Sequence, residues 1–94
     1  MSLDEKFKAV HRLIKQGDLI SIRDLLEHHL DPNLPNKFGW TLLMLAALHG
    51  RGDIAQLLIV HGADKSRRNK FGQSAAELAE AKGHHTLAAA LTVD

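Results

Sequence analysis

The chain has 94 residues, of which 45% are hydrophobic and 24% charged, the composition of one small globular domain rather than of a disordered segment. Its formal net charge of +1 gives no strong overall field, and the absence of cysteine excludes disulfide bonds and thiolate sites. Acidic residues occupy the start of the chain, where a signal peptide has basic ones, and no apolar run approaches the roughly 20 residues of a membrane span. These features predict a soluble cytoplasmic or nuclear protein with no membrane partner.

Helix boundaries follow from capping residues and glycines, taken in chain order. Ser2 and Glu5 have the spacing of a capping box, which predicts a helix start at the beginning of the chain. Further on, Thr41 is a suitable N-cap for the apolar stretch 42–49. Gly50 then supplies the left-handed residue that commonly ends a helix.

A second helix of the same kind follows directly. Asp53 is its expected N-cap, Ile54, Leu57 and Leu58 form an apolar face, and Gly62 is its expected terminator. Later in the chain Ser74 and Glu77 again have capping-box spacing. The chain therefore reads as short helical hairpins joined by polar turns.

These hairpins repeat with a period of 33 residues. The phrase Asn-Lys-Phe-Gly occurs at 36–39 and again at 69–72, and residues 34–61 align without a gap on 67–94 with ten identities in 28 positions. The same interval separates further pairs and triplets, namely Gly17, Gly50 and Gly83; Leu25, Leu58 and Leu91; Asp31 and Asp64; and His28 and His61. We therefore predict one domain, 1–94, made of three units, 1–33, 34–66 and 67–94.

Helices of eight to ten residues are marginal alone, because nucleation is costly and few hydrogen bonds follow it. Each unit must bury its apolar stripe against the next, so stability is expected to come from stacking. The residues expected in the shared core are Leu13, Leu25, Leu43, Leu45, Ala46, Ala47, Ile54, Leu58, Leu78, Ala79, Leu87 and Leu91.

The middle unit, from Asn36 to Ser66, resembles an ankyrin repeat. It carries that family's glycine, threonine, leucine and Ala-Ala pattern from Gly39 to Ala47, and it ends on the family's Gly-Ala-Asp. The third unit matches less fully, and the first resembles an N-terminal capping repeat. The resemblance implies an all-α solenoid of helix-turn-helix units linked by β-hairpin-like fingers, with Asn-Lys-Phe-Gly at each finger tip and its glycine at a positive φ angle.

Three positions depart from the family pattern. Met44 stands where the family has a histidine that hydrogen-bonds between repeats, and Glu77 stands there in the third unit, where its spacing from Ser74 predicts a helix cap instead. His29 occupies a position that is usually a left-handed glycine, so the first turn is expected to be strained or differently shaped.

The resemblance also implies a function: a non-catalytic module (adaptor, scaffold or inhibitor) that binds another protein through its finger tips and the concave face of its first helices. Three of the four aromatic residues fall on this surface, although Phe38 and Phe71 could instead simply pack on each other. The residues expected to bind the partner are Lys37, Phe38, Trp40, Leu48, His49, Arg68, Lys70, Phe71 and Gln73, with Lys15, Gln16, Ala81 and Lys82 on the same face.

Two alternative functions remain open. The run Lys65 to Lys70 has four basic residues in six, and it could bind nucleic acid or another anionic partner, although no aromatic-lined groove or basic helix accompanies it. Self-association through Ile59 and Val60 is the second, with a monomer favoured.

Seven histidines raise the question of a metal site. His28 and His61 should lie on stacked helices about 8–10 Å apart, whereas two zinc ligands each lie about 2 Å from one ion. Adjacent histidines such as His84 and His85 diverge on a helix. We therefore expect surface histidines, no metal or other cofactor and, without a catalytic motif, no enzyme.

Overall fold

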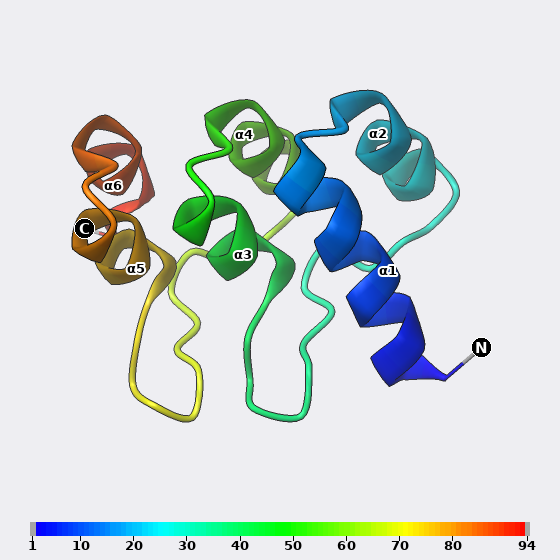
Figure 1. The fold of residues 1–94 in the computed structure, drawn as a ribbon, viewed down its shortest axis with the longest axis horizontal. Helices are drawn as coiled ribbons and strands as arrows, with labels where there is room; N and C mark the ends of the chain where they lie inside the picture. The colour runs from blue at the N-terminus through cyan, green and yellow to red at the C-terminus, as the bar shows by residue number, and fades with distance from the viewer. Residues whose placement is uncertain (1, 94) are drawn as a thin grey trace.

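The computed structural model describes residues 2–93, which form six helices arranged as three antiparallel pairs (Figure 1). The helices, with their bounds, are α1 (Leu3–Gln16), α2 (Leu19–Glu27), α3 (Leu42–Leu48), α4 (Gly52–Val60), α5 (Ala75–Ala81) and α6 (His85–Leu91). None of the described helices is long and apolar enough to cross a membrane.

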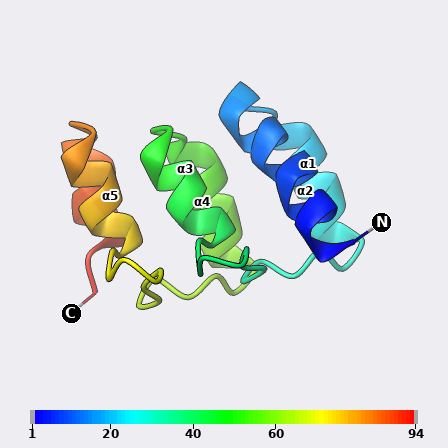
Figure 2. The same ribbon diagram turned by 60° about the horizontal axis from the view of Figure 1, so that its bottom comes forward.

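The three pairs stack side by side in two layers. Figures 1 and 2 show α1, α3 and α5 in one layer, α2, α4 and α6 in the other, and the pairs tilted in nearly the same direction. Helix α3 lies at the centre of the stack, because it packs against α1, α4 and α5. The described residues thus form the three stacked helical hairpins that the 33-residue period predicted, and together they make the all-α solenoid that the resemblance implied.

Most predicted caps are present. The hydroxyl oxygens of Ser2, Thr41 and Ser74 accept hydrogen bonds from the backbone N–H groups three residues later, and Glu77 completes a reciprocal capping box with Ser74. The prediction of Asp53 as a cap is wrong. Helix α4 begins at Gly52 without a side-chain cap, and the Asp53 carboxylate accepts from the adjacent Ile54 N–H at 2.8 Å. A carboxylate in the first turn still interacts favourably with the helix dipole.

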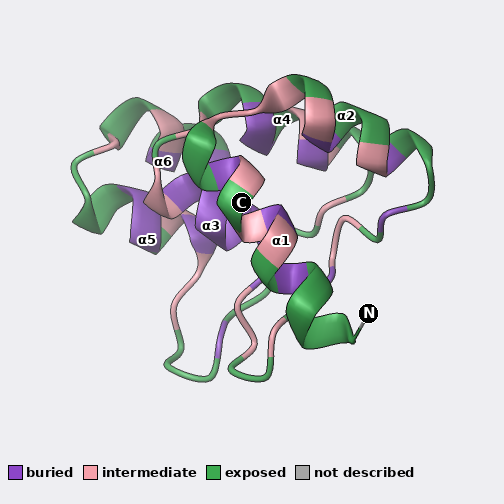
Figure 3. Cartoon of the chain, turned by 45° about the vertical axis from the view of Figure 1, so that its right-hand side comes forward, coloured by how far each residue is buried: buried purple, intermediate pink, exposed green. Residues whose placement is uncertain are grey.

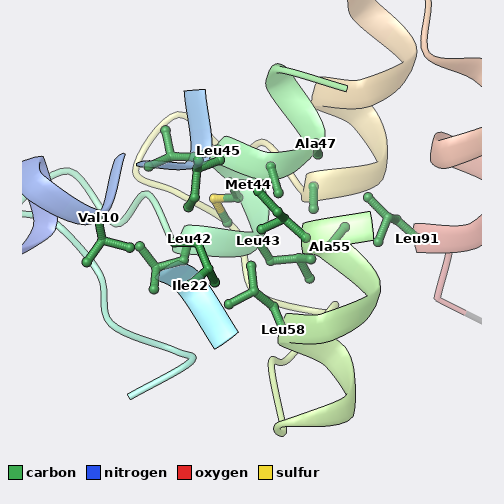
Figure 4. Close-up of a cluster of buried hydrophobic side chains, with 14 of the residues drawn as sticks. Val10, Ile22, Leu42, Leu43, Met44, Leu45, Ala47, Ala55, Leu58 and Leu91 are labelled. Carbon is green, nitrogen blue, oxygen red and sulfur yellow. The ribbon is translucent and has the colours of Figure 1, made fainter. Parts of the chain in front are cut away.

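The core lies between the two layers and runs through all three units, where the buried faces turn inward in Figure 3. Figure 4 shows its centre, where Leu42, Leu43 and Met44 from α3 meet Ile22 from α2 and Leu58 from α4. Burying a side chain of this size contributes about 1.5–3 kcal/mol each, which short helices need.

Nine of the twelve residues expected in the core are buried, but Leu13, Leu25 and Leu87 are only partly buried. Leu13 and Leu25 line a hollow of about 540 Å³ on the outer side of the first pair. An end unit has a neighbour on one side only, so its outward leucines keep contact with water. The core residues not predicted are Phe7, Val10, Ile14, Ile22, Leu26, Leu30, Leu34, Leu42, Met44, Ala55, Ala75 and Ala88.

Neighbouring units interlock at their helix-ending glycines. The His84 ring of the third unit lies over Gly50 of the second, so that a methyl group added there would approach its Cε1 atom to 2.6 Å. The Arg51 guanidinium covers Gly17 in the same way, and its Nη2 donates to the Lys15 carbonyl at 2.6 Å. Both glycines have positive φ, which lets the neighbour approach closely.

His29 adopts the left-handed conformation expected at its position, with φ of 73°. It is the one residue other than glycine with positive φ between residues 2 and 93. Its Cβ atom makes this conformation costly, so the first turn carries strain that the glycine-containing turns avoid.

Candidate partner-binding surface

Two loops project from the stack below the helices, visible at the bottom of Figure 1. Each is closed by a single antiparallel bridge, Pro35 to Thr41 and Arg68 to Ser74, and no longer strand forms within residues 2–93. The expected β-hairpin fingers are therefore reduced to one bridge each. We call these loops the first and second fingers (32–41 and 65–74).

The same asparagine shapes each finger. The Asn36 side-chain oxygen accepts from the N–H groups of Phe38 and Trp40 at 2.9 and 3.0 Å, and Asn69 accepts from Phe71 and Gln73 at 2.9 and 3.1 Å. The glycine that follows each tip has positive φ, 77° and 76°, as the resemblance implied. The Asn-Lys-Phe-Gly phrase thus encodes one rigid turn used twice.

The finger tips carry two exposed phenylalanines. Phe38 and Phe71 are 46% and 69% exposed, yet their ring centroids lie 6.5 Å apart. The Lys70 N–H donates to the Phe38 carbonyl at 2.9 Å, and the Lys37 ammonium lies 5.3 Å from the Phe38 ring centroid. The rings therefore pack against each other and still leave a large part of their surface open.

An apolar depression lies where the first finger meets α1 and α3. It has a volume of about 240 Å³ and is lined by Phe7, His11, Asn36, Phe38, Trp40, Leu45 and Leu48. We call it the aromatic depression. Trp40 is half-buried because one side packs on the core, and Leu48 is likewise half-buried. Both residues contribute to the depression while they also support the fold.

Beside the depression two histidines face each other. The Nε2 atoms of His11 on α1 and His49 at the end of α3 lie 3.2 Å apart. Burial lowers the pKa of both rings, and positive neighbours lower it further: Lys15 for His11, and His11, Lys15, Arg51 and Lys82 for His49. One ring donates an Nε2 hydrogen to the other, and the lowered pKa values favour the neutral form of each ring.

Two of the predicted binding residues are held by contacts within the chain. Arg68 pairs with Glu77 and donates to the Gly72 carbonyl at 2.7 Å, and the Gln73 amide oxygen accepts from Asn69 at 3.0 Å. Hydrogen bonds with Ser74, and to a smaller extent with Arg68, lower the pKa of Glu77. These side chains support the second finger rather than stand free on it.

The basic run Lys65 to Lys70 is also partly engaged. Besides Arg68, Arg67 donates to the Asn33 carbonyl at 3.2 Å and lies 3.9 Å from the Asp64 carboxylate. Two of its four cations are thus engaged within the chain, Arg67 between units and Arg68 within the second finger and its helix. Val60, proposed for self-association, is 70% exposed, whereas Ile59 is half-buried.

A larger hollow lies elsewhere, on the outer side of the third pair, with a volume of about 690 Å³. Small and polar side chains such as Ala88 and Ser74 line it. It lies at one end of the stack, and the hollow beside Leu13 lies at the other end. Within residues 2–93 no three histidine or acidic side chains gather as metal ligands would.

Comparison with known proteins identifies the repeat. The family described as "Ankyrin repeats (many copies)" matches residues 25–79, which is more than half of the chain. The chain belongs to the ankyrin repeat family. Ankyrin repeats generally mediate protein–protein interactions, and ankyrin repeat proteins are generally not enzymes.

Individual relatives share this region. The chain is 38% identical over 65 residues to mouse (Mus musculus) 2-5A-dependent ribonuclease, covering 68% of this chain and 9% of that protein. It is 33% identical over 76 residues to human (Homo sapiens) Ankyrin repeat family A protein 2, covering 81% and 24%. An ankyrin repeat protein of fowlpox virus is 38% identical over 64 residues, covering 68% and 9%. The chain therefore spans a quarter or less of these relatives.

The ankyrin pattern located the finger tips but missed part of the surface. Phe7 and His11 lie on α1, the helix that matches the family least, and the pattern gives them no role. The contact between His11 and His49 joins positions 38 apart, which are not equivalent in the 33-residue repeat. The sequence offers one weak signal, a His11 to Lys15 spacing that places both on one helix face.

Proposed function

We propose that this chain is a non-catalytic protein-binding module, an adaptor, scaffold or inhibitor, that docks a partner protein on its finger tips and on the side of α1 and α3 that faces them. The observation that carries the proposal is the pair of exposed phenylalanines, Phe38 and Phe71, beside the aromatic depression. Aromatic side chains next to a pocket and ringed by polar residues contribute most of the affinity in protein interfaces.

The arrangement of the fingers supports this proposal. Hydrogen bonds from Asn36 and Asn69 fix each turn, and the Lys70 N–H bond to Phe38 joins the two tips. A rigid pair of rings loses little conformational entropy when a partner binds. The free rings already touch, so a partner would cover their open faces rather than separate them.

The test is affinity capture from a source lysate with three versions of the chain. The Phe38→Ala/Phe71→Ala variant should lose a protein that the wild type retains, and Ile20→Ala/Val60→Ala should retain it. The control residues are 78% and 70% exposed and lie on the other layer, so this variant also removes two exposed apolar side chains, but away from the fingers. Trp40 is left intact, because it packs on the core and its replacement would change both stability and binding.

Thermal unfolding of all three versions accompanies the capture. Equal melting temperatures with loss of the partner in the phenylalanine variant alone support docking at the fingers. Retention of the same proteins by wild type and phenylalanine variant contradicts the proposal, as does a partner lost equally from the control. A large fall in the melting temperature of the phenylalanine variant would show that the rings serve to pack the fingers.

A further inference from the structure

The small net charge conceals a separation of charge between the two layers. The first helices with their fingers carry ten of the twelve lysines and arginines but four of the eleven acidic residues, whereas the second helices with their turns carry two basic and six acidic residues. The first group covers residues 2–17, 32–50 and 65–83, and the second covers 18–31, 51–64 and 84–93. The side that carries the aromatic depression is therefore the basic side.

Several cations on this side have no acidic partner among the described residues, namely Lys15, Lys37, Lys70 and Lys82. The positive charges of Lys15 on α1 and of Lys82 at the end of α5 both lower the pKa of His49. Coulomb repulsion from these groups is unfavourable in the free protein. The centre of this face is therefore a place where a carboxylate would be stabilised.

The geometry of the histidine pair also favours a carboxylate at the centre of this face. With 3.2 Å between the Nε2 atoms, only one hydrogen fits between the rings, so one nitrogen donates and the other accepts, and a hydrogen on the accepting nitrogen would set two N–H groups against each other. No carboxylate within residues 2–93 pairs with either ring. A carboxylate from outside would supply the missing negative charge and would favour the protonated pair.

His11 belongs both to this pair and to the wall of the aromatic depression. An apolar side chain placed in the depression would therefore hold its own chain next to the histidines. Extended chain advances about 3.3 Å per residue, so the carboxylate must come from a residue within about two positions of the apolar one. The two features together define one recognition site rather than two.

We propose that this face binds an acidic segment of the partner protein, with one apolar side chain in the aromatic depression and a neighbouring Asp or Glu carboxylate on the His11 and His49 pair. The inference rests on the proposed function and names the chemistry of the partner. Because the surroundings disfavour protonation of the free pair and a bound carboxylate favours it, binding takes up a proton. Lys15, Arg51 and Lys82 oppose protonation of the pair until the carboxylate arrives. Asp4, Lys8 and Lys37 are the other charged groups beside it, because they line a hollow together with His11.

The test begins with selection of peptides of about twelve random residues, a length that covers the face when extended, displayed on phage and bound to the wild-type chain. The selected sequences should be enriched in Asp and Glu beside a Leu, Ile, Phe or Trp. Their binding should fall at least about tenfold in Lys15→Glu/Lys82→Glu and stay unchanged in Lys6→Glu/Arg23→Glu, which alters net charge equally. Lys6 belongs to the basic group but lines the hollow on the outer side of the first pair, and Arg23 lies on α2. Lys15→Gln/Lys82→Gln replaces the first variant if charge reversal lowers the melting temperature.

Each outcome separates the two proposals. Selected peptides without acidic enrichment, or equal binding to both charge-reversed variants, overturn the acidic partner and leave the protein-binding function standing. Failure to select any peptide that depends on Phe38 and Phe71 overturns the protein-binding function. Binding of mixed-sequence single-stranded DNA with the same dependence on Lys15 and Lys82, and of no peptide, assigns the face to nucleic acid and overturns both.

Proton uptake tests the histidine contact itself. Titration calorimetry of a selected peptide in two buffers of different ionisation enthalpy should show uptake of up to one proton by wild type near neutral pH and none by His11→Gln/His49→Gln. Affinity of the wild type should rise as pH falls from about 8 to about 6, by about tenfold for each pKa unit gained on binding. Equal uptake by both proteins, or none by wild type, overturns the contact.

Discussion

Replacement of glycine by alanine at equivalent positions tests whether the units interlock as the structure has them. Gly50 and Gly83 have similar positive φ angles, 69° and 82°, but His84 covers Gly50 whereas nothing lies within 4 Å of a methyl group at Gly83. The left-handed conformation costs alanine about 1–2 kcal/mol, offset by about 0.4–1 from the less flexible unfolded chain. Gly83→Ala should therefore destabilise the chain by about 1 kcal/mol.

Gly50→Ala carries the same backbone cost and displaces the His84 ring as well. Overpacking of this kind costs about 1–3 kcal/mol, so the total should be about 2–4 kcal/mol. Urea unfolding followed by helical circular dichroism measures the free energy of unfolding of both variants. In thermal melts followed by the same signal, their melting temperatures should differ by at least about 4 °C. The double variant Gly50→Ala/His84→Ala should lose the excess, because the ring is gone. Equal destabilisation of the two glycine variants, or an excess that survives in the double variant, would refute the interlocking of the second and third units.

Three further predictions concern stability. His29→Gly should stabilise the chain by about 1 kcal/mol, because it removes a side chain from a left-handed turn, and a lower urea midpoint would contradict this. Leu58→Ala should cost about 2–5 kcal/mol, and Leu87→Ala distinctly less in the same assay, because the first residue is fully buried and the second only partly so. Because burial lowers the pKa of His11 and His49, stability should be full above about pH 6.5 and fall below it, and His11→Gln/His49→Gln should flatten this loss in thermal melts across that range.

The fold could be predicted from the sequence because the same local signals recur at one interval. Thr41 and Ser74 each begin a helix, and Gly39 and Gly72 each close a finger, so each unit repeats the evidence of the other. The wrong cap at Asp53 shows the limit of single signals. An acidic residue favours both the cap and the first turn, and here the helix begins one residue earlier, at Gly52, so Asp53 lies in the first turn.

The core was predicted less completely, for a reason that concerns packing. The repeat locates leucines that recur, such as Leu58 and Leu91. Phe7 and Ile14 are also buried, but they lie on α1, the longest described helix with 14 residues, whose sequence departs from the other units. Conversely, Leu25 recurs with Leu58 and Leu91 and is yet only partly buried, because no unit covers its outer side. Sequence periodicity identifies equivalent positions, whereas burial depends on the neighbours that each position has.

In the candidate site too, equivalent positions of the repeat have different neighbours and different chemistry. Gln16, His49 and Lys82 are equivalent positions of the three units, yet one is neutral, one is paired with an imidazole and one is a cation. The framework repeats every 33 residues, but the chemistry of the face that it builds changes from unit to unit. The contact between His11 and His49 arises because α1 packs against α3 with these two side chains directed toward each other, which no alignment of units predicts. Residues that break the repeat on an exposed face are therefore where selection for a partner would act, since selection for folding acts on the residues that keep it.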